Sequence, residues 1–109
     1  MQGFLDTQGK AGDTVRLVAT DAAQHFPNSK LVNASGKPAI AVNITCEDNQ
    51  VRFTHGDTAV PTQGDSGLGH ILYIGQSYRI SNGNSIRSFQ HLNHTNGSVG
   101  VLQATFEYD

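Results

Sequence analysis

Five histidines are the side chains of this chain with the widest range of possible chemistry. They are His25, His55, His70, His91 and His94. A metal site needs three or four ligands that converge, commonly from spacings such as His-x-His with a distant Glu. No His-x-His occurs, and His91 and His94 are expected to face opposite sides of a strand or to flank a turn. We therefore predict no metal and no cofactor, and exposed histidines with structural roles.

The segment Gly64–Gly67 reads Gly-Asp-Ser-Gly, as around the nucleophile of chymotrypsin-like serine proteases. That chemistry needs a His base and an Asp orienter, held by two barrels that together take about twice this length. His25, His55 and Asp57 are present, but the chain is too short for that fold. Because Gly, Asp and Ser are also turn formers, we interpret the segment as a turn and predict no catalytic residue.

Cys46 is the single cysteine, so no internal disulfide is possible. It continues an alternating apolar strand, which predicts a small buried side chain. Glu47 and Asp48 follow it and would raise the pKa of its thiol, which disfavours a nucleophile.

The segment 56–69 is rich in Gly, Asp, Thr, Pro and Gln, which predicts a long surface loop. Its carboxylates Asp57 and Asp65, with nearby hydroxyls, could collect a calcium ion, although solvation of a loop explains them as well.

The whole chain has 109 residues and a net charge of −2, with no Trp. This describes one domain that lacks a basic surface for nucleic acid or anionic membranes. The start, Met1 to Gly12, fits neither a signal peptide nor a membrane span. We therefore expect synthesis and maturation in a reducing cytoplasm. We divide the chain into an N-terminal arm, residues 1–13, and a domain, residues 14–109.

Apolar residues recur with a period of two along most of the chain, which indicates β-strands. Strands are expected at Val15–Ala19, Ile40–Cys46, Val51–Thr54, Leu68–Ile74, Ser77–Ile80, Ile86–Leu92 and Ser98–Tyr108. Turns are expected at 47–50, at Asn82-Gly83-Asn84 and at 93–97, with a bulge near Gly100. The one expected helical turn is Asp21–Phe26. This pattern predicts an all-β, single-domain β-sandwich of jelly-roll-like type, with about seven or eight short strands and an extended N-terminal arm.

The second half, Ile40 to Tyr108, resembles small β-rich virion proteins of tailed bacteriophages that decorate or cement the head. The stretches that carry this resemblance are Ile44–Asp48, Val51–Phe53, Pro61–Thr62, Gly69–Leu72, Gly75–Ile80, Ile86–Phe89 and Leu102–Tyr108. The resemblance implies a non-enzymatic structural protein on the capsid surface, bound to the major capsid protein as a homo-oligomer, with a trimer favoured. It carries over no catalytic residue.

Phe4 and Leu5 are two bulky apolar residues in an otherwise polar, Gly-containing arm, so they are candidate partner-binding residues. A frayed terminus is the other interpretation of this arm.

Two other functions stay open. The first is a carbohydrate- or receptor-binding module on the same architecture, with Tyr73, Tyr78 and Tyr108 as candidate platforms. The second is a small enzyme, either a hydrolase that uses Ser66 or a metal-dependent cupin.

Overall fold

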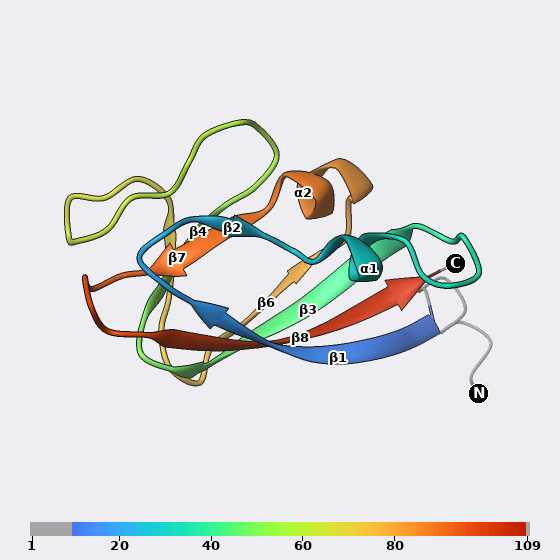
Figure 1. The fold of residues 1–109 in the computed structure, drawn as a ribbon, viewed down its shortest axis with the longest axis horizontal. Coiled ribbons are helices and arrows are strands. Elements are labelled where there is room, and N and C mark those ends of the chain that lie inside the picture. Colours follow the sequence, from blue (N-terminus) through green and yellow to red (C-terminus); the bar gives the residue numbers. More distant parts are fainter. Residues whose placement is uncertain (1–9, 109) are drawn as a thin grey trace.

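The computed structural model describes residues 10–108, which form two four-stranded antiparallel sheets packed face to face (Figure 1). The elements in chain order are β1 (Lys10–Ala19), β2 (Gln24–His25), α1 (Asn28–Leu31), β3 (Ala39–Asp48), β4 (Val51–Thr54), β5 (His70–Leu72), β6 (Ser77–Ile80), α2 (Gly83–Ser88), β7 (Gln90–Asn93) and β8 (Gly100–Tyr108). Within the described residues, neither helix has the length and apolar character that crossing a membrane requires.

The strand order is that of a jelly roll. One sheet has the order β1-β8-β3-β6 and the other β2-β7-β4-β5. The first strand therefore pairs with the eighth, the second with the seventh, the third with the sixth and the fourth with the fifth, as in one long hairpin folded over on itself. We call these the β1 sheet and the β2 sheet. The predicted all-β sandwich is confirmed.

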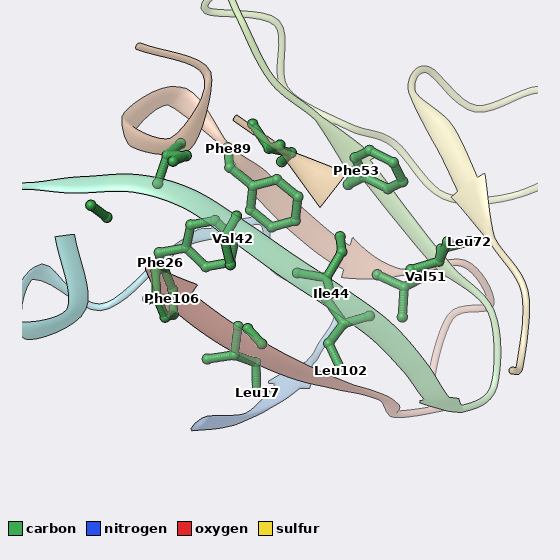
Figure 2. Packing of buried hydrophobic residues seen from close by; sticks show 14 of the residues in the cluster. Leu17, Phe26, Val42, Ile44, Val51, Phe53, Leu72, Phe89, Leu102 and Phe106 are labelled. Atoms are coloured by element: carbon green, nitrogen blue, oxygen red, sulfur yellow. The ribbon is translucent and has the colours of Figure 1, made fainter. Parts of the chain in front are cut away.

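The core lies between the sheets and is built around stacked aromatic rings (Figure 2). The rings of Phe26 and Phe89 stack with centroids 4.2 Å apart, and Phe106 meets Phe26 edge-on at 5.0 Å. Ile44 of β3 and Leu102 of β8 fill the space beside them and are fully buried. Burying each such side chain stabilises the fold by about 1.5–3 kcal/mol.

The outer face of the β1 sheet is polar. Side chains of adjacent strands pair across it: Thr14 with Thr105, Thr45 with Ser77, and Gln103 with Glu47. Arg79 of β6 also pairs with Glu107 of β8, across the intervening strand β3. Both Arg79 guanidinium nitrogens donate to Glu107, at 2.6 and 3.0 Å. These hydrogen bonds hold the pKa of the Glu107 carboxyl below its ordinary value. The period-two alternation predicted for these strands thus reflects one buried and one polar face.

Three local predictions are wrong. The expected helical turn Asp21–Phe26 contains strand β2, and the short helix α1 begins only after Pro27. The expected turn at Asn82-Gly83-Asn84 is the start of helix α2, so the first half of the expected strand Ile86–Leu92 is helical. The expected bulge near Gly100 lies on the facing strand, where the register of β3 shifts between Cys46 and Asp48.

Two boundaries also differ. Strand β1 already pairs with β8 from Lys10, so the sandwich extends into the segment that we had assigned to the arm. Strand β5 is only three residues long, shorter than the expected Leu68–Ile74. The turn after β3 agrees with expectation, because Asn49 has a left-handed φ of 56°, which Asn tolerates.

Candidate functional site

The long connection between β4 and β5, residues 55–69, is folded onto the outer face of the β2 sheet. Arg52 of β4 is buried, and its guanidinium donates to the carbonyls of Gly64 at 2.7 Å and Gly69 at 2.6 Å. Thr54 Oγ1 donates to the carbonyl of Ala59 at 2.7 Å. These side chains leave the sheet on the side opposite the core. The polar side chains of this face therefore hold the loop in place.

The Gly-Asp-Ser-Gly segment lies in this loop and forms a turn, in which the amide of Gly67 donates to the carbonyl of Gly64 at 3.0 Å. Ser66 is exposed. The imidazole beside the segment is that of His94, whose Nε2 lies 3.5 Å from an Asp65 carboxylate oxygen. His94 contacts the Asp of the motif, which is not the His–Ser contact that nucleophile activation requires.

His55 and His70 lie close together where the edge strands β5 and β6 face each other, with ring centroids 6.2 Å apart. His55 Nε2 lies 3.2 Å from the Tyr78 hydroxyl, and both rings stand beside Phe53. Burial lowers the pKa of His55, and the nearby His70 lowers it further. A cavity of about 290 Å³ adjoins both rings and Asp57. Among residues 10–108, no three or more His, Cys, Asp or Glu side chains are grouped so that they could hold a metal ion.

The prediction that the histidines are exposed is wrong for His91 and His94, which are 1 % and 7 % exposed. His91 points into the sandwich beside Phe89, and neither of its ring nitrogens has a hydrogen-bond partner. Burial, with a smaller contribution from the charge of His25, lowers its pKa from 6.5 to about 4. His91 is therefore a neutral core residue at physiological pH.

Cys46 is fully buried, as predicted. Burial raises the pKa of its thiol, and its Sγ donates to the carbonyl of Asn49 at 2.7 Å. The thiol thus supports the turn between β3 and β4.

Four connections meet at one narrow end of the sandwich, which we call the four-loop end (Figure 1). They are residues 20–23, 49–50, 73–76 and 94–99. Asp21 links the first to the last, since its Oδ1 accepts from the amide of Gly97 at 2.9 Å and from Asn93 Nδ2 at 2.7 Å. These hydrogen bonds, with one from Gln63, hold the pKa of Asp21 below its ordinary value.

A polar hollow of about 380 Å³ opens at this end. Its lining residues are Asn49, Gln50, Asp65, Ile74, His94, Thr95 and Ser98. A second hollow of about 340 Å³ adjoins it and shares Asp65, His94 and Thr95. We call the first of these the four-loop hollow. Its walls come from four segments that are distant in the sequence, so no local motif could have revealed it.

The remaining candidate residues are spread over the molecule. Tyr73 and Tyr78 are partly exposed, whereas Tyr108 is buried and its hydroxyl donates to the carbonyl of Lys30 at 2.7 Å. Phe4 and Leu5 lie outside the described residues. Lys10 and Tyr108 pair with each other at the end opposite the four-loop end.

No protein-family model, curated protein or solved structure matches this chain. The function is therefore inferred from the fold and from the chemistry of the chain's own residues.

Proposed function

We propose that this chain is a non-enzymatic structural protein of a tailed-bacteriophage virion, which decorates or cements the capsid by binding the major capsid protein. The observation that carries the proposal is the difference between the two narrow ends of the sandwich. The described chain begins at Lys10 and ends at Tyr108 side by side at one narrow end, and the four connecting loops gather at the other. Such a domain can be held by a terminal segment while its loops project away.

The internal organisation of the polar groups also supports a structural role. The side chains of Arg52, Thr54 and Asp21 each fix a loop by hydrogen bonds to its main chain. Jelly rolls are common in viral capsid proteins and in lectins, so the architecture is compatible with this role without specifying it.

In this proposal many copies of the chain bind one capsid, and this multivalency supplies the binding free energy. A capsid presents the same surface repeatedly, and a homo-oligomer, with a trimer favoured, would engage several copies at once. Each contact can then be weak. Phe4 and Leu5 are the proposed anchors, because bulky apolar side chains gain most when a partner buries them.

Removing residues 1–9 tests the proposal, and the structure shows why the deletion must stop there, since β1 begins at Lys10. The shortened chain is mixed with capsids assembled from the major capsid protein encoded in the same genome and is then sedimented. We expect the full chain to sediment with the capsids and the shortened chain to stay in solution.

A point variant and a matched control sharpen the test. Phe4→Ser with Leu5→Ser should lose binding, whereas Val32→Ser, at an exposed apolar residue of the sandwich, should retain it. Failure of the full chain to sediment with capsids, or a genome without a major capsid protein, contradicts the proposal. Light scattering on the purified chain measures the oligomer directly.

A further inference from the structure

The four-loop hollow has a buried donor or acceptor that the rest of the protein leaves unused. His94 is 7 % exposed, and its Nε2 has no hydrogen-bond partner. An Asp65 carboxylate oxygen lies 3.5 Å from this nitrogen, and the Asp65 side chain is fully exposed. Asp65 and His94 both line the hollow, so a ligand seated there lies next to both side chains. An unpaired buried polar atom costs free energy, which a ligand hydroxyl in this position would recover.

The frame of the hollow is fixed by main-chain hydrogen bonds. The amide of His94 donates to the carbonyl of Gln50 at 3.1 Å, and the amide of Gly64 donates to the carbonyl of His94 at 2.8 Å. Asn49 Nδ2 donates to the carbonyl of Val99 at 2.6 Å. The hollow is thus formed before a ligand arrives, which reduces the entropy cost of binding.

The chemistry of the walls selects one class of ligand. Asn49, Gln50, Thr95 and Ser98 offer amides and hydroxyls, which both donate and accept. The Asp65 carboxylate repels an anion, and a single carboxylate is too few for a hard cation. An apolar ligand would leave the polar groups unpaired.

We propose that the four-loop hollow binds a neutral, hydroxyl-rich ligand, namely one residue of a carbohydrate. The Asp65 carboxylate and His94 Nε2 bind neighbouring hydroxyls, the amides of Asn49 and Gln50 bind others, and Ile74 packs on the C–H face of the ring. Ile74 is 61 % exposed and borders the hollow, so it can serve this role. The volume of the hollow, about 380 Å³, falls in the range of small-molecule sites.

The site is separate from the proposed capsid anchor. The four-loop end lies opposite the end at which Lys10 and Tyr108 pair. A chain anchored to the capsid through the Lys10–Tyr108 end would therefore present the hollow outward. Carbohydrate binding and capsid binding can therefore succeed or fail independently.

The test is an NMR titration of the purified, full-length chain with a panel of methyl glycosides of glucose, galactose, mannose and N-acetylglucosamine. We expect at least one of them to shift the amide signals of residues 49–50, 64–65 and 94–98 saturably, with a Kd on the order of 1 mM. Asp65→Asn and Ser98→Ala should each weaken that binding about tenfold, because the first replaces a charged acceptor oxygen by a neutral amide donor and the second removes a hydroxyl.

Asp57→Asn is the matched control, since Asp57 is an exposed carboxylate of the same loop that does not line the hollow, and it should bind as the unmodified chain does. Three outcomes overturn the inference: no shifts at the hollow with any glycoside of the panel, equal binding by Asp65→Asn and Ser98→Ala, or shifts at the hollow produced by calcium chloride but by no glycoside.

Discussion

Arg52 holds the 55–69 loop against the β2 sheet. Its guanidinium is buried and joins the β2 sheet to two carbonyls of the 55–69 loop. The carbonyl of Gly69 lies where φ is 111°, a left-handed value that favours Gly, and a Cβ there would approach the carbonyl of Phe53 to 2.7 Å. The loop and the arginine therefore depend on each other.

We expect Arg52→Ala to lower the free energy of unfolding by about 2–3 kcal/mol, because two part-buried carbonyls lose their charged donor. Arg52→Lys should recover only part of this, since an ammonium cannot reproduce the two-pronged geometry. Urea denaturation measures both. Arg16→Ala is the control, because Arg16 is exposed on β1, and an equal loss there would contradict the assigned role.

His91 couples stability to pH. Its pKa is about 4 in the folded chain, against an ordinary value of 6.5, so the unfolded chain takes up a proton first as the pH falls. The contribution of neutral His91 to the free energy of unfolding is fully present above pH 6.5. It is lost as the pH falls towards 4, and the free energy of unfolding decreases by about 3 kcal/mol over this range.

Urea denaturation across this range measures the effect, and His91→Leu should remove most of it. Because neither ring nitrogen is hydrogen-bonded, the substitution should cost little at pH 7. An NMR titration of the His91 ring gives an independent check, and a midpoint near 6.5 would refute the prediction.

At the scale of elements, the residues that begin helix α2 suit both a hairpin turn and the N-cap of a helix. Asn82 Oδ1 accepts from the amides of Asn84 at 2.8 Å and Ser85 at 3.2 Å, which is the geometry of an N-cap. The same Asn-Gly-Asn string also suits a hairpin turn. In this fold the segment is helical, and the helix places Ile86 in the core of the sandwich.

Asn82→Ala should lower the free energy of unfolding by about 1 kcal/mol, as for loss of an N-cap. Thermal denaturation followed by circular dichroism measures the change. The neighbouring Ser81→Ala should leave the midpoint unchanged, since Ser81 is exposed and precedes the cap. Equal shifts in the two variants would contradict the capping role.

At the scale of the molecule, the topology joins residues from the two ends of the chain. Strand β8 lies between β1 and β3, and Lys10 pairs with Tyr108. Such pairings close long loops, which slows folding.

We expect refolding in milliseconds to seconds, the range of all-β domains with distant pairings. Stopped-flow tyrosine fluorescence can follow it, because the chain has three Tyr and no Trp. Leu102→Ala in β8 should speed unfolding or slow refolding strongly, whereas Val32→Ala, at an exposed site, should do neither. Refolding in microseconds would contradict this view of the topology.

The sequence by itself determined the features that depend on neighbouring residues. Period-two spacing placed the core residues Val42, Ile44 and Cys46 on one face of β3, and the left-handed tolerance of Asn49 placed the turn that follows. In β4 and β7 all four residues of each strand are buried because the 55–69 loop covers the outer face, so alternation there does not separate buried from exposed residues.

Only the tertiary structure decided which polar groups meet. Asp65 reaches His94, Arg52 reaches Gly64, and Asp21 reaches Gly97, each across a stretch of chain that forms other elements. Spacing along a strand fixes the face on which a side chain lies, but the partner across space is fixed by how the sheets and loops fold over one another. The hollow that Asp65 and His94 line is therefore a property of the fold and not of any one segment.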